Sequence, residues 1–341
     1  MNFESQERYS RQMLFAPIGV AGQQRIGSSR VLIVGMGALG TVLSSHMVRA
    51  GVGMVRMVDR DYVEPSNLQR QMLYDEDDAA LSLPKSEAAA RKLARINSHV
   101  RLEPVVSDVT PLNVEQFLSG IDLVLDGTDN FRTRLLLNDA CFKAGIPLVY
   151  GGAVSAQGMT AMLVPGETCC LRCLLGSDPG GEGGQTCDTV GVIAPIVDIV
   201  ASYQAVEALK YVVGDAEARR GGLLSLEVWH YRAVNLKLPD ARPDCPTCRR
   251  REYPALSVEA AEASTLCGRD TVQIQGAKPF DLGKWEQRLA PSCKVKRNPY
   301  LLRVELPEGE RLVLFPDGRV LVQGSGDAVR ARSLYDRYIG S

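Results

Sequence analysis

The chain has 341 residues, of which 45% are hydrophobic and 23% charged, as is usual for soluble globular proteins. Its formal net charge of -1 gives no electrostatic indication of a nucleic acid or an anionic membrane as a partner. The polar N-terminus lacks an apolar signal core, and the longest apolar stretch, 191–203, contains Asp198 and is too short to span a bilayer. With nine cysteines and no export signal, we expect a reducing cytoplasm.

The first half of the sequence alternates apolar runs with helix-like segments. The first apolar run lies within 30–40 and predicts a strand that ends in a glycine-rich turn. Further strands are predicted at 54–59, 101–106, 122–126 and 147–151. A helix is predicted from that turn to Gly51, and another over 84–97, where Pro84 suits a helix start. This alternation predicts an α/β fold with a doubly wound, mostly parallel, Rossmann-like sheet.

The pattern changes after Gly151. A strand at 159–164 is expected to extend the sheet, and a glycine-rich loop (176–185), a long helix (193–213) and a strand (223–229) follow. Pro and Arg are frequent in 242–257, as in linkers, and we place the linker itself at 251–262, between a domain at 1–250 and a small α+β module at 263–341. The module has strand-like segments at 272–274, 300–306, 311–315 and 320–323, a helix-like segment at 281–290 and a hairpin turn at 315–319.

A glycine-rich motif indicates a nucleotide site. GMGALG (35–40) matches GxGxxG between a predicted strand and a predicted helix, so Gly35, Gly37 and Gly40 allow close approach of a phosphate to the helix N-terminus. Asp59, at the end of the next strand, is placed to accept hydrogen bonds from a ribose. The alternative is a tight strand–helix turn without a ligand.

Charges that follow Asp59 favour a triphosphate over NAD. Asn67, Arg70 and Lys85 supply one amide and two cations, and catalysis at phosphorus relies on charge neutralisation and positioning. The chain has only three histidines, so a dehydrogenase would lack its usual proton-transfer residue. Any one of these charges alone is equally typical of a solvated surface.

The segment VLDGTDN (124–130) places polar side chains at the carboxyl end of a predicted strand, where open α/β sheets bind ligands. Its candidates are Asp126, Asp129 and Asn130, and an acid here can hold Mg²⁺ against phosphate oxygens. The alternative role for Asp129 or Asn130 is that of a helix N-cap.

These motifs together resemble the ThiF/MoeB family of sulfur-carrier adenylyltransferases, relatives of ubiquitin-activating enzymes. The resemblance covers roughly residues 5–250 and rests on RYSRQ (8–12), GMGALG, Asp59, SNLQRQ (66–71), Lys85 and TDN (128–130). It implies adenylation, dependent on ATP and Mg²⁺, of the C-terminal Gly-Gly carboxylate of a ubiquitin-like sulfur-carrier protein. That carboxylate is ionised at neutral pH, so adenylation requires no general base, in keeping with the scarcity of histidine.

The resemblance also implies roles for single residues. Arg11 would reach the phosphates from the other subunit of a homodimer, Gly35, Gly37 and Gly40 would hold the nucleotide, and Asp59 would hold its ribose. Asn67, Arg70 and Lys85 would contact the phosphates and stabilise the transition state, and Asp129, beside Asn130, would organise Mg²⁺. The family often has glycine where this chain has Ala38, which is a small departure.

Two CxxC pairs, Cys170/Cys173 and Cys245/Cys248, predict a four-thiolate zinc site. Four protein ligands leave no open position, so the zinc should be structural and join two segments that are 71 residues apart. The alternative, two redox dithiols, lacks a thioredoxin-like setting. The family also carries this zinc.

The other cysteines divide into three groups. Cys187 matches a family cysteine that in some members links covalently to the activated carrier, and the alternative is that it is dispensable for adenylation. Cys141 and Cys169 are interpreted as small packing residues, whereas Cys267 and Cys293 have no assigned role.

The preferred hypothesis is therefore a cytoplasmic, homodimeric adenylyltransferase with ATP, Mg²⁺ and structural Zn²⁺. We favour a ThiS-like carrier of thiamine thiazole biosynthesis over a MoaD-like carrier of molybdopterin biosynthesis, because the C-terminal module resembles an extension of some ThiF-type proteins. No rhodanese domain is apparent, so the sulfur donor should be a separate protein. The rival hypotheses are an NAD-dependent oxidoreductase and a non-catalytic zinc scaffold that binds a ubiquitin-like protein.

Overall fold

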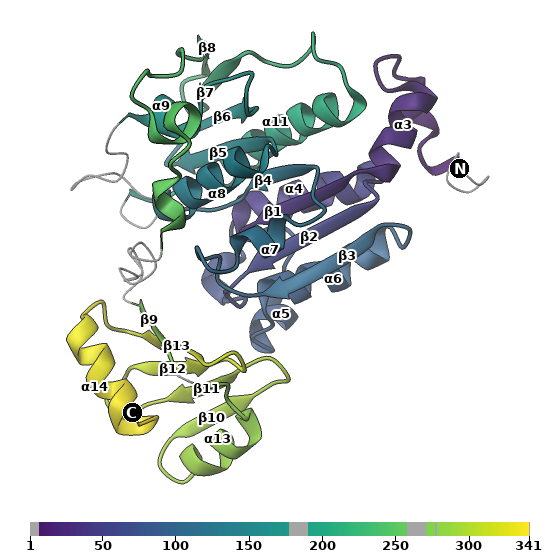
Figure 1. Ribbon diagram of the computed structural model, residues 1–341. Helices are drawn as coiled ribbons and strands as arrows, with labels where there is room; N and C mark the ends of the chain where they lie inside the picture. The colour runs from purple at the N-terminus through teal and green to yellow at the C-terminus, as the bar shows by residue number, and fades with distance from the viewer. Residues whose placement is uncertain (1–6, 177–189, 258–270, 277, 341) are drawn as a thin grey trace. The chain divides into compact units, whose positions relative to one another are not determined.

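The computed structural model describes residues 7–176, 190–257, 271–276 and 278–340 (Figure 1). The chain divides into two compact units, which are described separately below. The larger unit comprises Met1–Ala80 and Pro84–Ala261, and the smaller unit comprises Leu81–Leu83 and Glu262–Ser341.

An eight-stranded sheet in the order β3-β2-β1-β4-β5-β6-β7-β8 forms the centre of the larger unit. Its strands are β1 (Arg30–Val34), β2 (Met54–Asp59), β3 (Arg101–Val106), β4 (Leu123–Asp126), β5 (Leu148–Val154), β6 (Gln157–Leu163), β7 (Gly222–Glu227) and β8 (Arg232–Lys237). The strands from β3 to β5 are parallel to one another, and β6, β7 and β8 continue the sheet in antiparallel fashion. The predicted α/β fold with a mostly parallel sheet is confirmed.

Helices cover both faces of this sheet (Figure 1). The larger unit contains α2 (Ser10–Leu14), α3 (Gly19–Ser28), α4 (Ala38–Ala50), α5 (Glu76–Ala80), α6 (Lys85–Ile96), α7 (Val114–Leu118), α8 (Phe131–Ala144), α9 (Leu171–Leu175) and α11 (Ala194–Val213). On one face, α7 and α8 pack on alternate residues of β1, such as Leu32 and Val34. The neighbouring residues Val31 and Ile33 are also fully buried, because strands of a doubly wound sheet are covered on both sides.

The N-terminal helices are anchored at the carboxyl ends of α4 and α6. The amide of Asn97, which follows α6, donates to the hydroxyl of Tyr9 (2.8 Å) and to the carbonyl of Val48 in α4 (2.9 Å). The Gln12 amide in α2 donates to the carbonyl of Ala50, the last residue of α4 (3.1 Å). These bonds fix α2 at the end of α4 that lies farthest from the glycine-rich turn.

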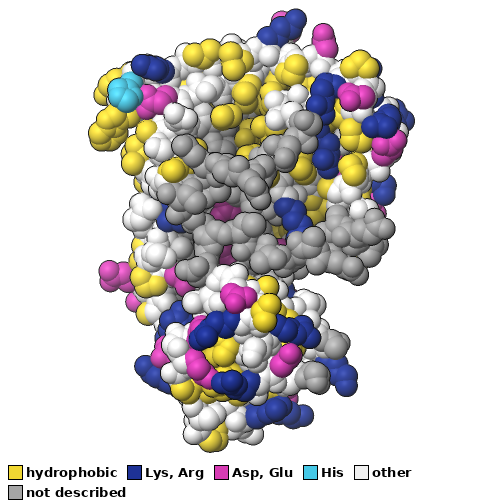
Figure 2. Space-filling view, turned by 90° about the vertical axis from the view of Figure 1, so that its left-hand side faces the viewer, with side chains coloured by type: hydrophobic (Ala, Val, Ile, Leu, Met, Phe, Trp, Pro, Cys, Tyr) yellow, Lys and Arg dark blue, Asp and Glu magenta, His cyan; other side chains and the backbone are white. Residues whose placement is uncertain are grey.

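The segment 242–257, which its composition indicated as a linker, contains two short helical turns, η2 (Pro246–Arg250) and η3 (Pro254–Leu256). Cys245 in this segment is fully buried in a cluster with Phe142 and Leu163, so the segment packs on the larger unit. Strand β8 was not predicted, and all six of its residues are exposed, which explains the lack of an apolar pattern. Several apolar side chains of the larger unit are exposed, among them Trp229 and Tyr231 beside β8. Figure 2 shows one face of the molecule, with hydrophobic side chains in yellow at its surface.

The smaller unit is built on an antiparallel five-stranded sheet in the order β10-β11-β12-β13-β9. Its elements are β9 (Thr271–Gln275), α13 (Leu282–Leu289), β10 (Lys294–Arg297), β11 (Leu302–Glu305), β12 (Arg311–Leu314), β13 (Arg319–Gln323) and α14 (Ala328–Tyr338). The predicted hairpin joins β12 to β13, with Gly318 in the left-handed region at a φ of 91°. The predicted α+β character is confirmed, whereas β10 and α14 were not predicted. No helix in the described part of the chain has the length and apolar character needed to cross a membrane.

Removal of a central side chain should destabilise the larger unit. Leu125 is fully buried in β4, so Leu125→Ala should lower the free energy of unfolding by about 2–5 kcal/mol. Leu112, which is 77% exposed, is the matched control. Leu112→Ala should change the free energy of unfolding by less than about 0.5 kcal/mol. Urea denaturation, monitored by circular dichroism, measures the stability of both variants. Equal midpoints for the two variants would contradict the assigned core.

Candidate active site

The glycine-rich turn between β1 and α4 is shaped by close contact with the turn after β4. Gly35 has a φ of 87°, and a β-carbon on it would lie 2.6 Å from the carbonyl oxygen of Gly127. A β-carbon on Gly40 would lie 1.9 Å from the carbonyl oxygen of Gly35. At Gly37 the nearest heavy atom would be 3.8 Å away. The first and third glycines are therefore required for packing, and the middle one leaves room for a ligand at the N-terminus of α4.

Asp59, the last residue of β2, holds this turn in place. Its Oδ2 accepts the backbone N–H of Met36 (2.6 Å) and its Oδ1 accepts that of Asp61 (2.7 Å). Burial raises the pKa of Asp59, and the ammonium group of Lys85 acts in the opposite direction. A carboxylate oxygen accepts more than one hydrogen bond, so the position also suits the expected contact with ribose hydroxyls.

Tyr74 joins the glycine-rich turn to the start of α6. Its buried hydroxyl lies 2.7 Å from the carbonyl oxygen of Met36 and 3.0 Å from that of Lys85. Lys85 also donates its backbone N–H to the carbonyl of Asp61 (2.9 Å). The Lys85 backbone is thereby fixed beside the segment that follows β2.

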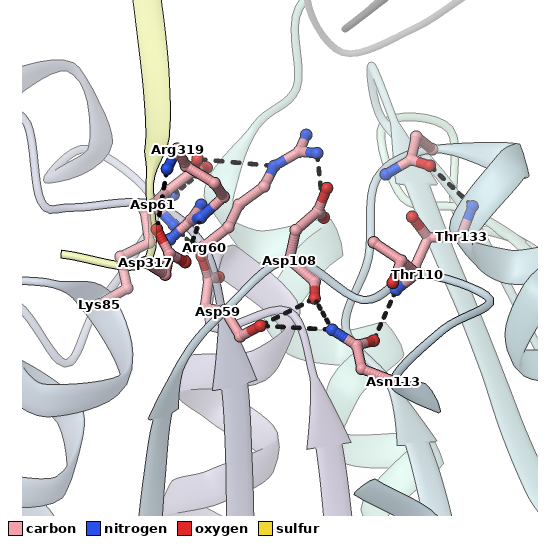
Figure 3. Close-up of polar contacts among 12 residues, drawn as sticks. Asp59, Arg60, Asp61, Lys85, Asp108, Thr110, Asn113, Thr133, Asp317 and Arg319 are labelled. Carbon is pink, nitrogen blue, oxygen red and sulfur yellow. Dashed lines mark hydrogen bonds and ion pairs between the residues drawn. The ribbon is translucent and has the colours of Figure 1, made fainter. Parts of the chain in front are cut away.

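Two cations lie among carboxylates in this region (Figure 3). The Lys85 side chain is 4% exposed, and its Nζ lies 3.1 Å from Oδ2 of Asp61. The Arg60 guanidinium lies between Asp61 (3.8 Å) and Asp108 (3.2 Å). Burial lowers the pKa of Arg60, but these carboxylates together with Asp129 and Asp59 raise it overall, so Arg60 stays charged.

The SNLQRQ segment packs next to the glycine-rich turn. Asn67 is buried in η1 (Pro65–Asn67), where its Oδ1 accepts the backbone N–H of Glu64 (3.1 Å). Nη1 of Arg70 donates to the carbonyl of Ser66 (3.1 Å). Gln71 is 2% exposed, its Nε2 is the atom nearest to Gly37, and its Oε1 is buried without a hydrogen-bond partner among the described residues. An unpaired buried acceptor beside an open turn fits a bound ligand that donates a hydrogen bond.

The loop after β4 presents Asp129. The fully buried Asp126 accepts the N–H and the hydroxyl of Thr128 through Oδ1 (2.9 and 2.7 Å). Nη2 of Arg134 donates to the carbonyls of Thr128 (2.7 Å) and Gly151 (3.0 Å). Asp129 follows as an exposed residue, and Asn130 caps α8 by accepting the N–H of Thr133 (2.9 Å). The structure thus shows the N-cap role for Asn130 and leaves Asp129 as the accessible acid of this loop.

Arg11 lies far from these residues within one chain. It is an exposed residue of α2, which is fixed at the carboxyl end of α4 by Gln12. The 13 residues of α4 span about 20 Å at about 1.5 Å per residue, and the glycine-rich turn lies at the other end. The position of α2 therefore keeps Arg11 away from this turn within one chain.

A second cluster consists of the four predicted zinc ligands. The Sγ atoms of Cys170, Cys173, Cys245 and Cys248 all lie within 4.8 Å of one another. The Cys170–Cys245 and Cys173–Cys248 pairs are 3.5 and 3.6 Å apart, and the Cys170–Cys173 pair is 4.0 Å apart. Zn–S bonds of about 2.3 Å in a tetrahedron give S–S distances of about 3.8 Å. The geometry and the donor type therefore fit Zn²⁺.

The remaining cysteines are not part of this cluster. Cys141 and Cys169 are buried among apolar residues, which confirms their interpretation as packing residues. Burial raises the pKa of Cys169 to about 11, so its thiol is protonated near neutral pH. Cys293 packs against the core of the smaller unit. Cys187 and Cys267 lie outside the described residues, as does most of the predicted loop at 176–185.

The donor set limits how Mg²⁺ would be held. Within residues 7–176 and 190–257, no group of three or more carboxylates or histidines converges as the four cysteines do. Mg²⁺ is often bound by one or two carboxylates together with phosphate oxygens, and the accessible Asp129 fits that arrangement.

Sequence reasoning missed several residues of this site, including Arg60, Asp61, Gln71 and Tyr74. Asp61 follows Asp59 in a polar segment, and Gln71 lies within the quoted SNLQRQ motif, so both had a weak local signal. Tyr74 had none, because its function depends on bonds to Met36 and Lys85, which are distant in the sequence.

Comparison with known proteins finds relatives that are similar over most of this chain. A protein-family model described as the ThiF family matches residues 9–247. The Bacillus subtilis sulfur carrier protein ThiS adenylyltransferase is 45% identical over 338 residues, which are 98% of this chain and 99% of that protein. The SAMP-activating enzyme E1 of Haloferax volcanii is 39% identical over 71% of this chain and 88% of its own length. The adenylyltransferase and sulfurtransferase MOCS3 of Drosophila persimilis is 34% identical over 89% of this chain, which spans 66% of that relative.

Solved structures share the fold. Crystal structures of Escherichia coli MccB, one of them with ATP, have TM-scores of 0.62 and 0.63. The structure with ATP is 22% identical over 71% of this chain and 74% of MccB. The other structure is 21% identical over 73% of this chain and 75% of MccB. At this level of identity the likeness concerns the fold alone.

The glycine-rich turn allows a matched pair of variants. Gly35→Ala should lower the free energy of unfolding by at least about 2 kcal/mol, because its β-carbon would meet the Gly127 carbonyl and its φ is positive. Gly37→Ala should lower the free energy of unfolding by less than about 1 kcal/mol, since the atom nearest to its new β-carbon would be Nε2 of Gln71, 3.8 Å away. Chemical denaturation compares the two, and an equal loss of stability would show that the turn is not packed as described.

Proposed function

Because this chain belongs to the ThiF family, we propose that it adenylates the C-terminal Gly-Gly carboxylate of a ubiquitin-like sulfur-carrier protein with ATP and Mg²⁺. The observation that carries the proposal is the turn at Gly37, which has room for a ligand. It lies beside Gln71 of the SNLQRQ segment, whose Oε1 is buried without a partner among the described residues. The 45% identity with a ThiS adenylyltransferase over nearly the whole chain supports the same reaction.

In this proposal the N-terminus of α4 receives the nucleotide phosphates, since the free backbone N–H groups of a helix N-terminus and its dipole favour anions. Asp59 accepts hydrogen bonds from the ribose. Asn67, Arg70 and Lys85 contact the phosphates and neutralise charge as pyrophosphate leaves. Mg²⁺ would be held by Asp129 and phosphate oxygens, where it supplies further charge neutralisation.

The reaction needs no proton transfer. An ionised carboxylate oxygen of the carrier attacks the α-phosphorus, the bond from that phosphorus to the pyrophosphate oxygen breaks, and an acyl-adenylate forms. The site accordingly contains cations, backbone donors and carboxylates, and none of them is assigned to proton transfer. The acyl-adenylate is the activated form from which a separate sulfur donor, such as a cysteine desulfurase or a rhodanese-like protein, would supply the thiocarboxylate sulfur.

We further propose that the protein works as a homodimer in which Arg11 serves the site of the partner. Arg11 is exposed, and α2 is fixed about 20 Å from the glycine-rich turn of its own chain. A contribution of Arg11 to phosphate binding therefore requires a second copy of the chain. The exposed Tyr203 and Val206 of α11 provide apolar surface for such an association.

A ThiS-like carrier is favoured over a MoaD-like carrier. The similarity to the Bacillus subtilis protein extends over 98% of this chain, so it includes the smaller unit, whereas the similarity to the Haloferax volcanii enzyme covers 71%. Four thiolates from Cys170, Cys173, Cys245 and Cys248 would hold a structural Zn²⁺, and we place the reaction in the cytoplasm, where these thiols stay reduced.

Exchange of labelled pyrophosphate into ATP tests the proposed reaction. With a ThiS-like carrier ending in Gly-Gly, Arg70→Ala and Asp129→Ala should each reduce exchange by at least about 100-fold, because each removes charge stabilisation at the phosphates. Cys187→Ser should leave exchange largely intact, since acyl or sulfur transfer follows adenylation. Arg95→Ala, an exposed cation near the far end of α6, is the control and should behave like wild type.

Absence of exchange with any Gly-Gly carrier, in dimeric protein that contains zinc, would contradict the proposed reaction. A change in nicotinamide absorbance without a protein substrate would favour the oxidoreductase alternative. Binding of a carrier without exchange would favour the scaffold alternative. Loss of exchange in Cys187→Ser would show that adenylation and sulfur transfer are not separate.

Mixing two inactive variants tests the role of Arg11. Arg11→Ala and Arg70→Ala should each be inactive alone, whereas a dimer of one copy of each has one complete site. The mixed dimer is obtained by co-expression with two affinity tags and purification on both. It should exchange pyrophosphate at about half the wild-type rate per dimer, because one of its two sites is complete. An inactive mixed dimer would contradict the contribution from the partner.

A further inference from the structure

A fully buried carboxylate, Asp139, lies outside the residues assigned to adenylation. It belongs to α8, nine residues after the N-cap Asn130, and has no exposed surface. Burial of an ionised group is costly unless hydrogen bonds and a counter-charge compensate it. The partners of Asp139 therefore indicate what this carboxylate stabilises.

The partners come from both zinc knuckles. In the first knuckle, Cys-Leu-Arg-Cys, Arg172 donates from Nε to Oδ1 of Asp139 (3.0 Å) and from Nη2 to Oδ2 (2.8 Å). In the second knuckle, Cys-Pro-Thr-Cys, Thr247 donates its hydroxyl to Oδ1 (2.6 Å). Arg172 and Thr247 occupy the same place in their motifs, directly before the second cysteine. One carboxylate thus binds the equivalent spacer residue of each knuckle.

Neighbouring contacts strengthen this attachment. The Asn138 amide donates to Oδ1 of Asp139 (3.0 Å), while its own oxygen accepts the backbone N–H of Leu171 (2.7 Å) in the first knuckle. Ala255, which follows the second knuckle, donates its N–H to Oδ2 of Asp139 (2.8 Å). Nε of Arg172 also lies 3.1 Å from the Thr247 hydroxyl, so the knuckles contact each other through these side chains. Residues of α8 therefore hold both knuckles by bonds that do not involve the thiols.

We propose that Asp139 is a positioning residue for the zinc site: it fixes the distance between the two CxxC knuckles and so slows the release of Zn²⁺. Groups that orient metal ligands through hydrogen bonds raise metal affinity by about 10–100-fold. The inference rests on the proposed zinc occupancy of the four thiols and does not depend on the adenylation reaction.

Zinc release to a chromogenic chelator tests the proposal in the full-length protein. Asp139→Asn removes the charge that binds Arg172, and Thr247→Val removes the hydroxyl that bonds to Asp139 and Arg172 at nearly constant volume. Both should release zinc at least about tenfold faster than wild type. Arg249→Ala, an exposed position in the second knuckle, should release zinc at the wild-type rate. Leu125→Ala controls for general loss of stability and should also leave the rate unchanged, since it lies in β4 away from the knuckles.

The outcomes separate the proposal from its premises. If Asp139→Asn does not fold, Thr247→Val alone decides, because it keeps the carboxylate and its bonds to Arg172. Wild-type release rates in the folded variants would overturn the role of Asp139 while leaving the zinc site intact. Equal acceleration in Leu125→Ala would also overturn it, since release would then follow global stability. Wild-type protein without zinc by elemental analysis would overturn both the zinc site and the role of Asp139, whatever the result of pyrophosphate exchange.

Discussion

The contact between the turns that follow β1 and β4 is the constraint on which the rest of the larger unit depends. A β-carbon on Gly127 would lie 2.4 Å from the carbonyl of Gly35, so only two backbones without side chains can approach this closely. The contact brings the N-terminus of α4 beside the loop that carries Asp129. A helix N-terminus that favours anions and an acid able to hold a cation are therefore placed together by the fold itself.

Helix α8 connects this site to the two CxxC knuckles. Its N-terminus is capped by Asn130 next to Asp129, and its middle turns carry Asn138 and Asp139, which bind both knuckles. The same helix packs on the sheet through an apolar face that includes Leu136 and Leu137. Hydrogen bonds to Asn138 and Asp139 thus hold the segments at 169–175 and 242–257 on a helix whose N-terminus lies beside Asp129.

The predictable features were those with a local signal. Buried parallel strands appear as apolar runs, and paired CxxC motifs indicate four thiolates that the structure brings together. Strand β8 escaped prediction because every residue in it is exposed. Tyr74 and Asp139 were missed because their roles depend on bonds to residues elsewhere in the sequence, such as Asp139 and Thr247, which are 108 residues apart. Gln71 was missed because its local signal, a place within SNLQRQ, is weak. The expected role of Arg11 at the phosphates followed from the resemblance, and the fold holds α2 at the end of α4 that lies farthest from the glycine-rich turn of the same chain.

The central claim is that the carrier carboxylate becomes linked to AMP in this site. The most direct measurement is the intact mass of a ThiS-like carrier after incubation with the zinc-containing protein, ATP and Mg²⁺, with rapid acid quenching. The account predicts a mass increase equal to one adenylyl group, located at the C-terminal glycine and absent when the carrier lacks its final Gly-Gly. A carrier of unchanged mass, under conditions where it binds the protein and ATP is present, would contradict the account.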